Sequence, residues 1–78
     1  MDKINDKITE FVNKYGAEGA FLTVERDDGE YDHKEFSLNR LEEAREYRSK
    51  CSFQWMNHRD IMYIEKYDGC THYCEQLI

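Results

Sequence analysis

Apolar residues repeat with helical spacing in two segments of this chain. In residues 2–15 they form one stripe, made up of Ile4, Ile8, Phe11, Val12 and Tyr15. This stripe predicts an amphipathic helix. Gly16 is expected to end it, because glycine readily adopts the left-handed conformation found after a helix C-terminus. Residues 38–50 carry a narrower apolar stripe and follow Ser37, a residue type that caps helix N-termini. They predict a second helix.

Two further regions predict β-hairpins. Each has two β-like runs around an Asp-Gly pair, 20–26 with 30–36 and 60–67 with 70–77. Asp-Gly favours a tight hairpin turn, because both central residues of a type I′ turn need a positive φ. If Asp28 and Gly29 form the first loop, Leu22 lies opposite Glu35 and Lys34 lies on the solvated face.

The second hairpin has apolar residues on both faces. With Asp68-Gly69 as its turn, one face holds Met62 and Ile64. The other face holds Ile61, Tyr63, Glu65, Tyr67, Cys70, His72 and Cys74. The pattern therefore does not distinguish the core face, and the hairpin is expected to be central in the sheet or covered on both sides.

Together these elements predict a single α+β domain over residues 1–78. An N-terminal helix is followed by β-β-α-β-β, and the helices pack on an antiparallel sheet. The apolar positions place Leu22, Val24, Leu41 and Ile64 in the core. Seventy-eight residues leave little room for a deep cleft, and the sequence holds no catalytic motif or glycine-rich phosphate loop. We therefore expect a protein that is not an enzyme, with no catalytic residues and no cofactor.

The chain is acidic, with a net charge of −6 and a pI of about 4.9. Nucleic acids and anionic membranes are bound through Lys and Arg, so neither is an expected partner. A basic protein surface is the natural partner of an acidic one. The sequence shows no secretory signal and no apolar run long enough to span a bilayer, which predicts a reduced, cytoplasmic protein.

The acidic residues concentrate in one segment. Residues 25–46 hold nine acidic and four basic residues, which accounts for −5 of the net charge, whereas residues 47–59 hold three basic residues and no acid. This asymmetry predicts an acidic docking surface with Tyr31 or Trp55 as its aromatic anchor. The alternative is an ordinary solvated surface. The candidate partner-binding residues are Asp27, Asp28, Glu30, Tyr31, Asp32, Glu35, Glu42, Glu43, Glu46 and Trp55.

A Cys-x-His-x-Cys run lies on the last predicted strand, where alternate side chains share a face. Cys70, His72 and Cys74 are candidate ligands of a small zinc module, with Cys51 or His58 as a fourth. Against this, alternate residues of one strand lie about 6.5–7 Å apart, which is too far for one ion to contact all three at ~2.0–2.3 Å. We assign no metal ligands from the sequence, and the zinc module stays an alternative.

A small acidic domain with a hairpin at 20–36, a helix at 38–50 and a terminal hairpin at 60–77 resembles small bacteriophage-encoded inhibitors. These include anti-CRISPR proteins and phage proteins that bind a host polymerase or nuclease. The resemblance implies stoichiometric binding in the host cytoplasm that occludes a nucleic-acid channel, and it implies a role for no particular residue.

The leading hypothesis is therefore a non-enzymatic inhibitor from a phage or mobile element. It would dock on a basic surface of a nucleic-acid-handling protein or complex. Besides this inhibitor and the zinc module, a third hypothesis is a self-associating structural protein, for example a homodimer. It would pair through an exposed strand edge or an apolar hairpin face.

Overall fold

The computed structural model describes residues 3–25, 33–54 and 61–78, and for residues 51–54 it describes the backbone only. The elements are α1 (Lys3–Tyr15), β1 (Ala20–Glu25), β2 (His33–Ser37), the 3-10 helix η1 (Leu38–Arg40), α2 (Leu41–Gln54), β3 (Ile61–Asp68) and β4 (Thr71–Gln76). The predicted α+β order of one helix followed by β-β-α-β-β is confirmed. None of the described helices is long and apolar enough to cross a membrane.

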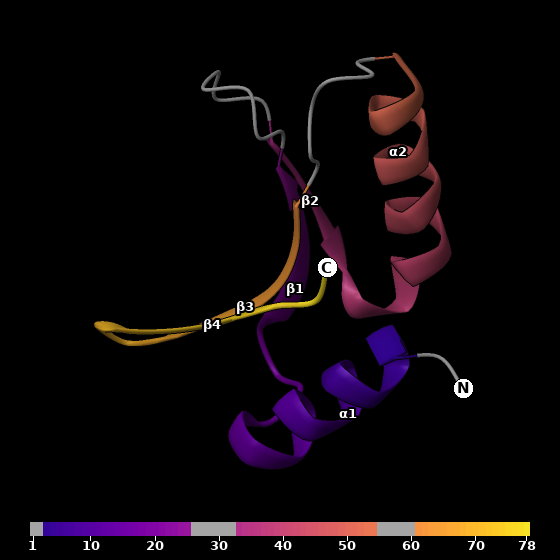
Figure 1. Ribbon diagram of the computed structural model, residues 1–78. Coiled ribbons are helices and arrows are strands. Elements are labelled where there is room, and N and C mark those ends of the chain that lie inside the picture. The colour runs from indigo at the N-terminus through magenta and orange to yellow at the C-terminus, as the bar shows by residue number, and fades with distance from the viewer. Residues whose placement is uncertain (1–2, 26–32, 55–60) are drawn as a thin grey trace.

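The four strands form one antiparallel sheet in the order β2-β1-β3-β4. Both α1 and α2 lie on the same side of this sheet, and the C-terminal end of the chain reaches the space between them and the strands (Figure 1). We call the side under the helices the covered face. On the opposite side, the open face, lie Phe21, Thr23, Glu25, His33, Glu35, Ser37, Ile61, Tyr63, Glu65, Tyr67, His72, Cys74 and Gln76.

The hydrophobic core lies between the covered face and the two helices. Its buried residues are Phe11, Leu22, Val24, Phe36, Ala44, Met62, Ile64 and Leu77. The core prediction is confirmed for Leu22, Val24 and Ile64, whereas Leu41 is only partly buried against the cluster. Met62 and Ile64 of β3 are buried on the covered face, and the described helices cover the second hairpin on this face only (Figure 1).

Helix α1 is attached to the covered face at its C-terminal end. Tyr15 stacks on Tyr73 of β4, with 4.3 Å between the ring centroids. The Nζ of Lys66 donates a hydrogen bond to the carbonyl of Tyr15 at 2.8 Å, and so satisfies one of the carbonyls that a helix end leaves without an intrahelical partner. Gly16 has a φ of +89°, and its amide donates to the carbonyl of Val12, as predicted for the residue that ends this helix.

The register of the first hairpin differs by one residue from the predicted register. Leu22 pairs with Phe36, so the predicted pairing of Leu22 with Glu35 is wrong. A shift of one residue moves every side chain of a strand to the opposite face. The observed register buries Phe36 in the core and leaves Glu35 on the open face. Burial of a large ring therefore sets the register, rather than the turn preference of Asp28 and Gly29, which lie outside the described residues.

The second hairpin turns one residue later than predicted. Asp68 pairs with Thr71, so the two-residue loop is Gly69-Cys70 instead of Asp68-Gly69. Gly69 has a φ of +62°, and no described residue other than glycine has a positive φ. This is the pattern of a type II′ turn, which requires glycine at its first central position. The strand register changes by two residues as a result, so each side chain keeps its predicted face.

Candidate functional site

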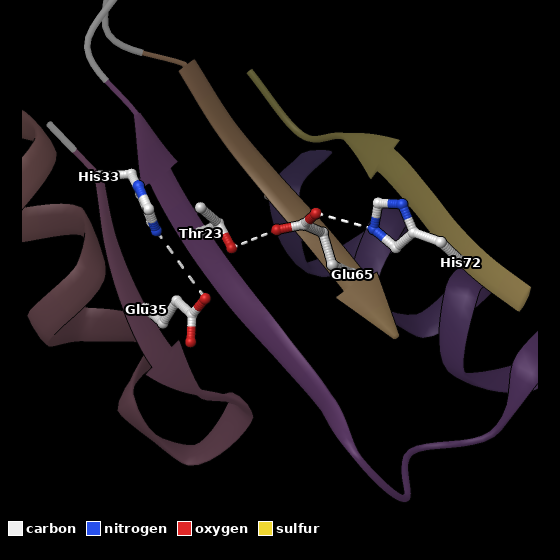
Figure 2. A network of polar contacts seen from close by, with 5 residues as sticks. All are labelled: Thr23, His33, Glu35, Glu65 and His72. Atoms are coloured by element: carbon white, nitrogen blue, oxygen red, sulfur yellow. Dashed lines mark hydrogen bonds and ion pairs between the residues drawn. The ribbon is translucent and has the colours of Figure 1, made fainter. Parts of the chain in front are cut away.

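The most organised group of polar side chains lies on the open face. Figure 2 shows Glu65 of β3 between Thr23 of β1 and His72 of β4. The hydroxyl of Thr23 donates a hydrogen bond to Oε2 of Glu65. Oε1 of Glu65 accepts from Nε2 of His72, at 2.9 Å, in the tautomer that carries the proton there. Both carboxylate oxygens of Glu65 are thus held from neighbouring strands.

The sheet places these residues diagonally across adjacent strands. Glu65 lies opposite Phe21 on one side and Cys74 on the other, so Thr23 and His72 are its diagonal neighbours. Long side chains span such diagonals. Thr23 is 5% exposed and is buried although it lies on the open face, and the Glu65 side chain is 15% exposed. Polar groups this buried need partners, because an unpaired one costs about 1–3 kcal/mol.

A second polar pair lies on β2, beside this network. His33 Nε2 is 4.0 Å from Glu35 Oε1, and both side chains are exposed. Figure 2 shows the pair on the β2 side of Thr23. A shallow hollow joins the two groups and is lined by Thr23, Glu25, His33, Glu35, Glu65 and Tyr67. The hollow thus joins polar side chains of β1, β2 and β3, and the contact between Glu65 and His72 extends this group to β4.

Aromatic rings also lie on the open face, and one of them, Tyr67 of β3, lines the hollow. Tyr67 is 60% exposed and stacks on the imidazole of His72, with 4.4 Å between ring centroids and 12° between planes. The ring of Phe21, on the neighbouring strand β1, stacks on Tyr67 with 6.1 Å between ring centroids. An exposed tyrosine beside desolvated polar groups is a typical component of a binding surface.

The charge of the open face is one-sided. It carries the carboxylates of Glu25, Glu35 and Glu65, and none of its described residues is a lysine or arginine. The two lysines of the strands point to the covered face instead. Lys34, predicted to be on the solvated face, has its amino group over the rings of Phe36 and Tyr47, and Lys66 bonds α1. The register that buries Phe36 thus also removes a positive charge from the open face.

Cys74 lies beside the network, opposite Glu65. Partial burial raises the pKa of its thiol above the ordinary value, and nearby carboxylates, chiefly Glu65, raise this pKa further. The potential ligand atoms of Glu65, His72 and Cys74 all lie within 4.8 Å of one another. The structure therefore brings two members of the predicted Cys-x-His-x-Cys run together with Glu65, whereas Cys70 lies in the Gly69-Cys70 loop and is not part of this group. The side chains of Cys51 and His58 lie outside the described residues.

The predicted acidic patch is divided between the two sides of the sheet. Glu35 is on the open face, whereas Glu42, Glu43 and Glu46 are exposed on α2, over the covered face. Arg45 pairs with Glu42 at 2.8 Å and Arg40 with Glu43 at 2.5 Å, so part of the helix charge is neutralised locally. The hydrogen bond from Arg40 lowers the pKa of Glu43. The remaining predicted residues, Asp27, Asp28, Glu30, Tyr31, Asp32 and Trp55, lie outside the described residues.

No role was predicted from the sequence for Thr23, Glu65 or Tyr67, whereas Glu25 was counted in the acidic segment 25–46. Strand alternation in the second hairpin already placed Glu65 on one face with His72 and Cys74, and this was a usable signal. Thr23 had no such signal, because its contact with Glu65 depends on the pairing of β1 with β3. No protein-family model, curated protein or solved structure matches this chain.

Proposed function

We propose that this protein is a non-enzymatic binding protein whose open face docks on a basic surface of another protein. The observation that carries this proposal is the charge of that face. Three carboxylates and an exposed tyrosine lie on a side of the sheet that no described helix covers, without a lysine or arginine among its described residues. Such a face attracts a positive partner and repels a negative one.

The open face also offers the two energetic components of an interface. Glu25 and Glu35 lie at the hollow and act through long-range attraction, which raises the association rate and weakens with salt. Tyr67 is the anchor, because a large ring with a polar tip gives most of the binding energy in many interfaces. In this proposal Tyr67 takes the part that the sequence analysis gave to Tyr31 or Trp55.

The class of partner follows from the same charge. A net charge of −6 disfavours direct contact with nucleic acid or with an anionic membrane. Pairing of two copies through their open faces is disfavoured too, because like charges would meet across a two-fold interface. Proteins that handle nucleic acid present clustered Lys and Arg, so a groove of this type is the proposed docking site. Occupation of such a groove would give the inhibitor role that the resemblance to phage proteins implies.

The proposal is tested by comparing charge reversals at two places on the immobilised chain. Glu25→Lys with Glu35→Lys changes the open face, and Glu10→Lys with Glu18→Lys makes the same change in net charge at exposed positions outside the sheet. Proteins retained from a lysate of the cells that express the chain are quantified by mass spectrometry at low and high salt. We expect a basic protein to be retained by the wild type and the control, and about tenfold or more weakly by the open-face variant.

Two results would overturn the proposal. One is equal retention by both variants, which would place the contact elsewhere on the molecule. The other is retention that does not fall with salt, because attraction between exposed charges is screened. Circular dichroism of both variants checks that the fold is intact, and Tyr67→Ala measures the contribution of the aromatic anchor separately from the charge.

A further inference from the structure

We infer that the open face holds a single divalent metal ion of the zinc class, bound by Glu65, His72 and Cys74. These residues offer a carboxylate oxygen, an imidazole nitrogen and a thiol sulfur, and the three ligand atoms lie within 4.8 Å of one another. The site lies on the same face as the proposed docking surface and shares Glu65 with it, but it needs no partner, because all three ligands belong to this chain.

The distances are close to those of a bound site. Tetrahedral zinc with ligands at ~2.0–2.3 Å places neighbouring ligand atoms about 3.3–3.8 Å apart. Oε1 of Glu65 and Nε2 of His72 are already 2.9 Å apart, at hydrogen-bond distance. A metal ion would take the place of the hydrogen bond between these two atoms, and the sulfur of Cys74, which lies within 4.8 Å of both, is the third ligand.

Cross-strand pairing solves the spacing problem found in the sequence. Three ligands on one strand are too far apart, whereas here two come from β4 and one from β3, where Glu65 lies directly opposite Cys74. The donor set selects the metal. Thiolate and imidazole favour zinc and similar transition metals over magnesium or calcium, which prefer oxygen ligands. Three protein ligands leave a fourth position of the tetrahedron open.

The surroundings of the three residues already orient them. The buried hydroxyl of Thr23 holds Oε2 of Glu65, which directs Oε1 toward His72. The ring of Tyr67 stacks on the imidazole of His72 and restricts its rotation. Residues that hold metal ligands in this way typically change metal affinity about 10–100-fold when they are mutated. Thr23 is therefore a positioning residue, whereas Glu65, His72 and Cys74 are the ligands.

The test titrates Co²⁺ into the purified, reduced full-length chain, without any partner, and then displaces it with Zn²⁺. Cobalt bound to a thiolate gives a charge-transfer band in the near ultraviolet, which reports sulfur ligation directly. We expect one equivalent to bind, loss of the band in Cys74→Ser, and binding about 10–100-fold weaker in Thr23→Val. Cys70→Ser is the matched control and should keep both the band and the affinity, because Cys70 is not part of the group.

Absence of the band in the wild type, or loss of the band in Cys70→Ser but not in Cys74→Ser, would overturn the inference. Glu65→Gln and His72→Gln are measured alongside, and unchanged affinity in both would also overturn it. Because the core lies on the covered face, we expect these open-face variants to fold, and circular dichroism checks this. No partner protein is present, so a negative result here leaves the docking proposal untouched, and the reverse also holds.

Discussion

The two faces of the sheet are built from the same strands and differ in almost every other respect. Leu22 and Thr23 are neighbours in the chain and are both buried, at 0% and 5% exposure. Leu22 points into an apolar cluster under the helices, whereas Thr23 points to the open face and bonds the carboxylate of Glu65. One strand thus contributes to the hydrophobic core through one set of positions and to a polar site through the alternate set.

The two faces also treat charge differently. Over the covered face, Glu42 and Glu43 of α2 pair with Arg45 and Arg40, and the hydrogen bond from Arg40 lowers the pKa of Glu43. On the open face, carboxylates gather around a thiol and raise the pKa of Cys74 in addition to the effect of burial. Ion pairs on an exposed helix contribute little to stability or binding. Carboxylates gathered on one face, without lysine or arginine beside them, attract positively charged groups.

The largest effect is expected on the covered face. Leu22→Ala should lower the free energy of unfolding by about 2–5 kcal/mol, because it removes a fully buried side chain and leaves a cavity. Urea denaturation measures this, and Leu22→Met, which conserves volume, should cost less than about 1.5 kcal/mol. If the alanine variant were no less stable than the methionine variant, the core would not depend on this position.

An intermediate effect is expected one residue further along β1. Thr23→Val keeps the shape of the side chain and removes the hydrogen bond to Glu65, which should cost about 1–2 kcal/mol in urea denaturation. Glu35→Gln, at an exposed position of the same face, is the control and should leave the stability unchanged. The contrast between the faces would break down if Thr23→Val were as destabilising as Leu22→Ala.

The element order could be predicted from the sequence because it depends on local patterns. Helical spacing gave α1 and most of α2, and strand alternation gave the faces of β3 and β4 correctly even though the turn is at Gly69-Cys70. The register of β1 with β2 could not be predicted from the turn residues. It is set by burial of Phe36, which is a tertiary contact with α2 through Tyr47.

The candidate site was predicted only in part, for a similar reason. His72 and Cys74 stood out because they are two residues apart on one strand. Their third partner, Glu65, comes from the neighbouring strand, and its orientation depends on Thr23, 42 residues away in the chain. Charge counting over residues 25–46 joined Glu35 with the glutamates of α2, although the sheet separates them. A count of charged residues along the chain does not show on which face of the sheet each residue lies.

A smaller effect concerns the thiol of Cys74. Glu65→Gln should lower the pKa of Cys74, because it removes a negative charge that disfavours the thiolate. The pH profile of alkylation at Cys74, followed by peptide mass spectrometry in the absence of metal, should therefore move to lower pH. Glu10→Gln on α1 serves as the control. A profile that did not move would mean that Glu65 contributes nothing to the charge felt by the thiol.

The smallest effect is expected on the outer face of the helical layer. Arg40→Gln should raise the pKa of Glu43 toward its ordinary value, because the hydrogen bond from the guanidinium is the main cause of the lowering. Carboxylate NMR titration measures the change, and Glu10 serves as the internal reference. An unchanged pKa of Glu43 would show that the Arg40–Glu43 pair does not persist in solution. The carboxylate of Glu43 would then not be neutralised by Arg40.

The central claim is that the partner docks on the open face and not on α2, and one retention measurement compares the two directly. Glu25→Lys with Glu35→Lys is compared with Glu42→Lys and Glu46→Lys, which makes the same charge change on the helix. We expect the helix variant to retain the basic partner protein and the open-face variant to lose most of this retention. Loss from the helix variant with retention by the open-face variant would contradict it.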